Sequence, residues 1–248
     1  MLPKNTIERF SKELLSLDLP KHHSSFTWKG QALRPAWNAR VELERAMKSA
    51  LSSTHALTVR NAADQIHRWG FGRSLPSVID HHDWFAKLQL SSAVWGNSES
   101  TAAQLVQACA ALHEKGIKIA RVSKWLCFID QQKFAIYDSR VSIALRGCRD
   151  NEGKPAFPIV PRRLLKHKTS WPGSGMPTSP LRSAEIYVDY VSLMQETAKL
   201  LNKNKVGELG GLYEPDNIET GWWPAHVEMA LFMAGDVWPP KLTITGPH

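Results

Sequence analysis

The sequence predicts an all-α protein, and three observations support this. Several segments repeat apolar residues at the three- and four-residue spacing of amphipathic helices. Convincing alternation of apolar and polar residues, the pattern of strands, is nearly absent. The chain has 248 residues, of which 43% are apolar, so it is long enough to bury a substantial core. We therefore expect two helical lobes with a cleft between them.

The first half of the chain contains four expected helices, over residues 4–17, 37–51, 58–69 and 77–89. The first two have one apolar face each. Thr58 is suited to cap the third helix, and Gly70 and Gly72 are suited to end it. Residues 20–36, which include Trp28 and Pro35, are expected to be irregular.

The second half contains five expected helices, over residues 100–115, 118–129, from 139 onward, 183–203 and 224–233. Gly116 ends the first of these, and Pro224 can occupy the first turn of the last. We expect one domain over 1–248 in four parts. These are an N-terminal helical segment (1–55), a helical lobe with the candidate catalytic residues (56–146), a basic loop (147–182) and C-terminal helices (183–248).

The overall charge favours a polyanionic partner, either nucleic acid or an acidic membrane surface. The formal net charge is +8 at pH 7. No segment approaches the roughly 20 apolar residues of a membrane span. The three cysteines, Cys109, Cys127 and Cys148, are odd in number and lack metal-ligand spacing, so we expect free thiols and a reducing compartment such as the cytoplasm.

The helix expected over 118–129 divides into two faces. Its buried stripe should consist of Ile119, Val122, Leu126 and Ile129. A different face carries three cations with an indole beside them: Lys118, Arg121, Lys124 and Trp125. The plain interpretation of this second face is a solvated basic surface, and the functional one is a surface for nucleic acid.

Asp138 immediately precedes the helix that begins at Ser139, so it is placed to be the N-cap of that helix. Hydrogen bonds from backbone N–H groups would favour its ionised form. Such a carboxylate can stabilise a cationic sugar or orient a nucleophile. The plain interpretation is a helix cap without a further role.

Basic and aromatic residues elsewhere complete the candidate nucleic-acid surface. The residues expected to contact DNA are Lys118, Arg121, Arg140, Arg162, Arg163, Lys166 and Lys168. The tryptophans expected to line a base pocket are Trp69, Trp125, Trp222 and Trp223. The plain alternatives are a solvated loop and aromatic anchors for the last helix. The histidine pairs lack metal-site spacing, so we assign no metal.

The run SKWLCFIDQQKFAIYDSRVSIAL (123–145), with VEMALF (227–232), resembles the bacterial 8-oxoguanine-glycosylase-like family of the helix–hairpin–helix DNA glycosylase superfamily. The resemblance is best over residues 60–146 and 220–235. It implies a lysine nucleophile and an assisting aspartate. Asp138 in YDSRV matches the aspartate motif, Lys124 is the first choice of nucleophile, and Lys118 is the alternative. GIKIA (116–120) replaces the usual Gly-x-Gly hairpin turn.

The resemblance implies an enzyme that flips a modified base out of double-stranded DNA and excises it, with or without a lyase step. Phage DNA with glucosylated hydroxymethylcytosine is one candidate substrate, and DNA with 8-oxoguanine is the alternative. The implied enzyme is a monomer without a cofactor. Two other possibilities stay open: a non-catalytic DNA-binding module on the same scaffold, and a helical protein-interaction domain.

Overall fold

The computed structural model describes residues 1–53, 55–76, 79, 82–113, 117–158, 176–206 and 221–235. These residues confirm the all-α class, because they form ten α-helices and only one two-stranded hairpin. The basic loop residues Arg162, Arg163, Lys166 and Lys168 lie outside the described residues.

The elements follow one another in this order: α1 (Lys4–Leu14), α2 (Leu19–Ser24), β1 (Thr27–Trp28), β2 (Gln31–Ala32), α3 (Leu33–Leu51), α4 (Ala56–Phe71), α5 (His82–Gly96), α6 (Ala102–Ala110), α7 (Ile119–Cys127), α8 (Ser139–Ala144), the 3₁₀-helix η2 (Leu145–Gly147), α9 (Pro180–Lys203) and α10 (Pro224–Ala234).

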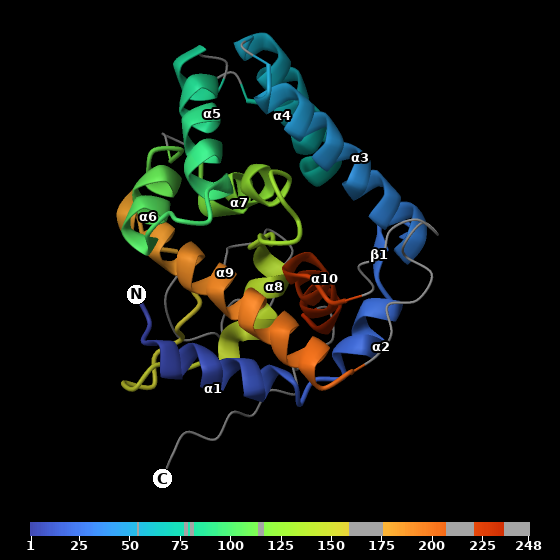
Figure 1. Cartoon of the computed structure of the whole chain (residues 1–248). Helices are drawn as coiled ribbons and strands as arrows, with labels where there is room; N and C mark the ends of the chain where they lie inside the picture. The colour runs from blue at the N-terminus through green and yellow to red at the C-terminus, as the bar shows by residue number, and fades with distance from the viewer. Residues whose placement is uncertain are drawn as a thin grey trace, which may run out of the picture.

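The helices form two groups that meet along α9 (Figure 1). In one group, α4 packs against α3, α5 and α7. In the other, α1 packs on α9, while α10 packs on α2, α8 and α9. The contacts of α6 and α7 with α9 join the groups. The first 55 residues are therefore divided between the groups, because α1 and α2 lie against the C-terminal helices whereas α3 lies against α4.

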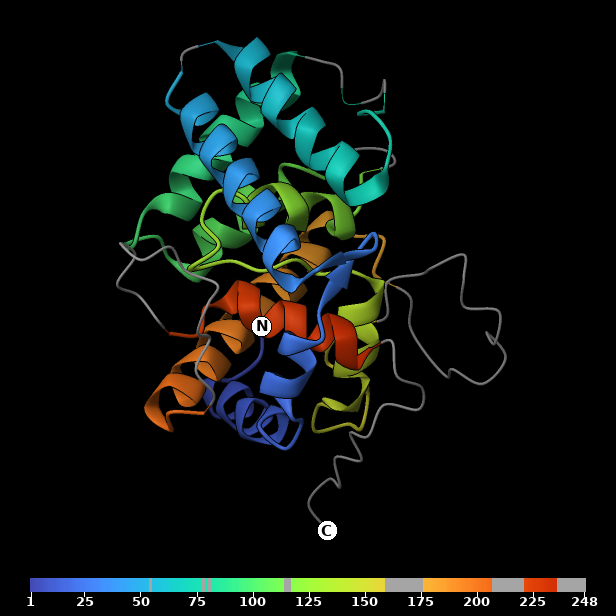
Figure 2. The ribbon, with the colours of Figure 1, turned by 90° about the vertical axis from the view of Figure 1, so that its right-hand side faces the viewer.

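Residues 20–36 are more regular than the sequence suggests. They contain α2 and a hairpin in which Thr27 pairs with Ala32. The two turn residues, Lys29 (φ 51°) and Gly30 (φ 80°), both have positive φ, as a tight hairpin turn of two residues requires. The expectation of an irregular segment was wrong because strands of two residues are too short to show alternation. Figure 2 shows this hairpin on the same side of the molecule as α10 and α8.

The ends of α4 confirm one expected cap and correct another. Gly72 has a left-handed conformation (φ 70°) and is the C-cap, as expected. The N-cap is His55 rather than Thr58, which lies inside the first turn. Gly70 also lies inside the helix and does not end it.

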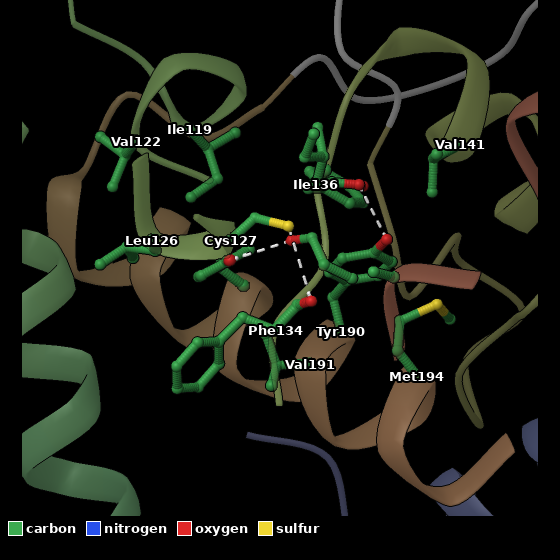
Figure 3. Packing of buried hydrophobic residues seen from close by; sticks show 14 of the residues in the cluster. Ile119, Val122, Leu126, Cys127, Phe134, Ile136, Val141, Tyr190, Val191 and Met194 are labelled. Carbon is green, nitrogen blue, oxygen red and sulfur yellow. Dashed lines mark hydrogen bonds between the residues drawn. The ribbon is translucent and has the colours of Figure 1, made fainter. Parts of the chain in front are cut away.

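The expected buried stripe of α7 is confirmed, since Ile119, Val122, Leu126 and Ile129 are at most 7% exposed. An extended segment, 134–137, crosses the core beside this stripe (Figure 3). Its carbonyl oxygens accept hydrogen bonds from side chains, whereas in a sheet they would accept them from a neighbouring strand. The Tyr190 hydroxyl donates to the Ile136 oxygen (2.8 Å) and the Tyr187 hydroxyl to the Ala135 oxygen (3.0 Å). Helix α9 therefore fixes the chain that leads to Asp138.

A buried ion pair joins α3 to α10. Arg40 and Glu228 are 1% and 2% exposed, and the Arg40 Nη2 atom lies 2.7 Å from the Glu228 carboxylate. Arg40 also donates from Nε to the Gln131 side chain (2.7 Å), which in turn donates to Glu44 (2.8 Å). The pair is therefore satisfied by further hydrogen bonds, as a buried pair needs to be.

Three further expectations concern the cysteines, membrane spans and metal sites. Cys109, Cys127 and Cys148 are all free and buried. Within the described part of the chain, no helix is both long and apolar enough to cross a membrane. The same part contains no group of three or more side chains suited to hold a metal ion.

Removal of one partner of the buried ion pair should destabilise the protein strongly. We expect Arg40→Met or Glu228→Leu to lower the free energy of unfolding by about 3–5 kcal/mol, because the other charged group stays buried without its partner. The double variant Arg40→Met/Glu228→Leu should lose less than the sum of the single losses. Chemical denaturation measures all four proteins.

The matched control lies on the same helix. Arg45 and Glu42 form an exposed pair at 2.6 Å, and its removal should change the free energy of unfolding by less than about 1 kcal/mol. Additive losses for Arg40 and Glu228 would show that the two side chains do not stabilise each other.

Candidate active site

A cavity of about 500 Å³ lies between the hairpin, the C-terminal end of α4, and helices α7, α8 and α10. We call it the Lys124 cavity. The side chains and backbone that line it belong to Thr27, Trp28, Lys29, Gly30, Gly70, Phe71, Ala120, Lys124, Asp138, Arg140 and Phe232. The two residues proposed from the sequence as nucleophile and assisting carboxylate, Lys124 and Asp138, therefore line the same cavity.

Lys124 is the most buried lysine of the described residues, at 4% exposed. Its ammonium lies 3.4 Å from the carbonyl oxygen of Ala120 and 4.9 Å from the centre of the Phe71 ring. Burial lowers the pKa of Lys124, while the negative charges of Asp138 and Glu228 oppose this effect. The net direction is downward, which increases the fraction of neutral amine at a given pH.

Asp138 is the N-cap of α8, as expected. Its Oδ1 atom accepts hydrogen bonds from the backbone N–H groups of Arg140 (2.9 Å) and Val141 (3.2 Å). Helix α8 is held against α10 at Gly235, where a Cβ atom would collide with the carbonyl oxygen of Arg140. Only glycine at position 235 therefore lets the end of α10 lie this close to the first turn of α8.

One buried hydroxyl links the segments that carry Lys124 and Asp138. Ser123 is fully buried, and its Oγ atom accepts a hydrogen bond from the N–H of Tyr137 (3.1 Å) and donates to the carbonyl oxygen of Tyr137 (3.3 Å). Ser123 precedes Lys124, and Tyr137 precedes Asp138. These two hydrogen bonds therefore hold α7 against Tyr137, the residue before Asp138.

Aromatic rings form much of the cavity wall. Trp28, Phe71 and Phe232 line it, and the rings of Trp28 and Phe232 are 5.5 Å apart. The Arg140 guanidinium lies over the Phe232 ring at 4.3 Å. Trp28 was not among the tryptophans expected to line a pocket. Gly30 suits a tight turn directly after the tryptophan, so the sequence contains a signal for the hairpin but none for the place of Trp28 at the cavity.

The four tryptophans expected in a base pocket do not line this cavity. Trp69 lies one layer behind, stacked on Trp28 at 5.0 Å. Trp125 is in the core, 1% exposed, and its Nε1 donates to the Ala63 oxygen (3.2 Å). Trp222 is buried and donates to the Val206 oxygen (2.8 Å), while Trp223 stacks on His226. The latter two anchor the start of α10, which was their plain interpretation.

The cations expected on one face of α7 have different environments. Lys118 is exposed, is the N-cap of α7 and does not line the cavity. Arg121 is half-buried, with its guanidinium 5.8 Å from the centre of the Phe71 ring. Lys124 is buried and lines the cavity. The structure therefore brings Lys124, rather than Lys118, together with Asp138 in one cavity.

A cluster of buried histidines and tryptophans lies beside the ion pair. The His23 ring is 5.3 Å from the rings of both Trp222 and His226. Burial lowers the pKa of His23 to about 4, and the charge of Arg40 acts in the same direction. Burial also lowers the pKa of His226 well below the ordinary value, with further contributions from His23 and Arg40.

These histidines should make stability depend on pH. The unfolded chain binds protons near the ordinary pKa of 6.5, whereas native His23 stays neutral down to about 4. The unfolded state therefore binds more protons between these values. The free energy of unfolding should fall as the pH drops from 6.5 to 4, by at most about 1.4 kcal/mol per pH unit for each histidine.

Urea unfolding at a series of pH values measures this dependence. His23→Phe should reduce the slope, because an aromatic ring remains but the proton site does not. The exposed His55 supplies the control, and His55→Phe should leave the slope unchanged. An unaltered slope in His23→Phe would contradict the assignment.

Ser123→Ala should destabilise the protein by about 1–3 kcal/mol, because it leaves the buried N–H of Tyr137 without its partner. Ser11 is the matched control. It is also fully buried, but its hydroxyl donates only to the Ile7 carbonyl one helical turn earlier (2.8 Å), so Ser11→Ala should be nearly neutral. Equal losses in the two variants, measured by denaturation, would show that the link to Tyr137 contributes nothing.

No family model, curated protein or solved structure matches the chain. What the site does must therefore be inferred from its own residues. The central observation is that a buried lysine and a helix-capping aspartate line one cavity with aromatic walls.

Proposed function

We propose that the protein is a DNA glycosylase that binds an extruded base in the Lys124 cavity and removes it from the sugar. The observation that carries the proposal is the shared cavity of Lys124 and Asp138. A buried amine with a lowered pKa is a suitable nucleophile. A carboxylate beside it is suited to stabilise positive charge.

The proposed chemistry uses two side chains. As the bond between C1′ and the base nitrogen breaks, its electron pair leaves with the base, which then takes up a proton. The carboxylate of Asp138 stabilises the positive charge that develops on the deoxyribose. The neutral amine of Lys124 attacks C1′ and forms a C–N bond, and one amine proton goes to the departing base. The C1′–O4′ bond then opens, O4′ takes up the second amine proton, and an imine is left. If water attacks C1′ instead, the product is a plain abasic site.

The remaining cavity residues suit an extruded nucleotide. Trp28, Phe71 and Phe232 bring aromatic rings to the cavity. Any of the four bases, or a modified base, can stack on an aromatic ring. Lys29 and Arg140 add positive charge at the same cavity. With the formal net charge of +8, they favour an electrostatic contribution to DNA binding. Base extrusion itself costs a few kcal/mol, less for a damaged or modified pair.

The proposed substrate is double-stranded DNA with a modified base. Glucosylated hydroxymethylcytosine in phage DNA is the first candidate, which would make the enzyme part of a bacterial defence against phage. The alternative is a repair glycosylase for 8-oxoguanine. Mass spectrometry of the bases released from a panel of DNAs, including both, separates the two.

Substitution of either site residue should abolish base release. We expect Lys124→Met and Asp138→Asn each to lower the single-turnover rate by at least about 100-fold, as loss of a reacting or charge-stabilising group does. Met keeps the length of the buried side chain, and Asn can still cap α8, so both variants should fold. Quantification of released base on the substrate found in the panel gives the rates.

Two further lysine variants show whether the loss of base release is specific to Lys124. Lys118→Ala tests the other candidate lysine, and Lys12→Ala serves as a control for an exposed lysine on α1. Borohydride trapping on the same DNA reports the lysine adduct, which Lys124→Met should lose. Unchanged turnover in both Lys124→Met and Asp138→Asn would overturn the proposed site. Salt-dependent DNA binding without any base release would favour a non-catalytic DNA-binding module.

A further inference from the structure

We propose that Gly70 is a positioning residue for Lys124: the absence of a side chain at Gly70 creates the space in which the lysine side chain lies. The catalytic consequence rests on the proposed function, but the packing relation does not. Gly70 belongs to the last turn of α4 and, like Lys124, lines the cavity.

The close approach is direct. A Cβ atom at Gly70 would lie 2.7 Å from Cδ and 2.8 Å from Cε of Lys124. Carbon atoms do not approach so closely without a shift, because optimal separations are about 3.5–4.0 Å. The added methyl group would therefore have to displace the lysine side chain.

Backbone conformation gives no separate reason for a glycine at this position. Positive φ occurs two residues later, at Gly72, where a left-handed helix end favours glycine. Gly70 is inside the helix and is not among the residues with positive φ. Within a helix, glycine is less favourable than alanine. The approach of Lys124 accounts for a glycine that the helix alone would disfavour.

Displacement of the Lys124 side chain would break the present contacts of its ammonium. On the α4 side, Phe71 faces the ammonium, and on the α7 side the Ala120 carbonyl lies within 3.4 Å of it. A methyl group at Gly70 would push the amine away from these contacts and change its position relative to Asp138. A misplacement of about 1 Å is enough to lower a rate about 100-fold.

The first test is a double-variant cycle that needs no activity. Gly70→Ala should lower Tm by a few degrees in the native protein, where Cδ and Cε of Lys124 occupy the space. In a Lys124→Ala background those atoms are absent, so Gly70→Ala should leave Tm unchanged or raise it. An equal effect of Gly70→Ala in both backgrounds would overturn the proposal.

Gly96 provides the matched control. It is also a helical glycine, at the end of α5, but a Cβ atom there would meet nothing within 4 Å. Gly96→Ala should therefore have the same small effect on Tm in both backgrounds. If the change of Tm caused by Gly96→Ala differed between the two backgrounds as much as that caused by Gly70→Ala, Lys124→Ala would perturb the whole fold. That outcome would overturn the proposal.

The second test separates positioning from folding. On a DNA substrate, Gly70→Ala should lower the single-turnover rate of base release about 100-fold while the Kd for DNA stays within about threefold. A normal rate would overturn the positioning role. If the native protein releases no base but the Tm coupling is present, the proposed function fails and the packing of Lys124 against Gly70 stands.

Discussion

The hydrogen bonds between Ser123 and Tyr137 are the constraint on which the candidate site depends. They cross the core between α7 and the extended segment before α8, and each residue directly precedes one of the two chemical groups. The tyrosines of α9 hold the same extended segment from its other side. One hydroxyl thus binds both the N–H and the carbonyl oxygen of Tyr137. The position of Asp138 relative to Lys124 therefore depends on this pairing together with the contacts from α9.

The electrostatics of the cavity depend on burial more than on any single neighbour. Desolvation is the largest influence on Lys124, and it acts against the attraction of Asp138 and Glu228. Arg40, the ion-pair partner of Glu228, lowers the pKa of Lys124 and so opposes the effect of Glu228. The ion pair between α3 and α10 therefore joins distant parts of the chain and adds two charges with opposite effects on the pKa of Lys124.

Sequence patterns predicted those parts of the site that depend on residues close together in the chain. The stripe of α7 and the Asp138 cap follow from spacing within a few residues, and both are confirmed. The aromatic wall could not be predicted in this way, because Trp28 and Phe232 come from opposite ends of the chain. For the same reason, helical spacing alone could not rank Lys124 above Lys118 as the candidate nucleophile. Only tertiary packing makes Lys124 buried and Lys118 exposed.

The hairpin has a consequence for how such a site can change over time. The lysine and the aspartate belong to one continuous stretch that the core fixes, whereas the hairpin contributes to the cavity from outside that stretch. Its turn is exposed, and exposed turns tolerate insertions and substitutions far better than core segments do. Under the proposed function, selection for a different ligand could reshape this wall while Lys124 and Asp138 stay in place. Ligand recognition and chemistry would then depend on separate segments of the chain.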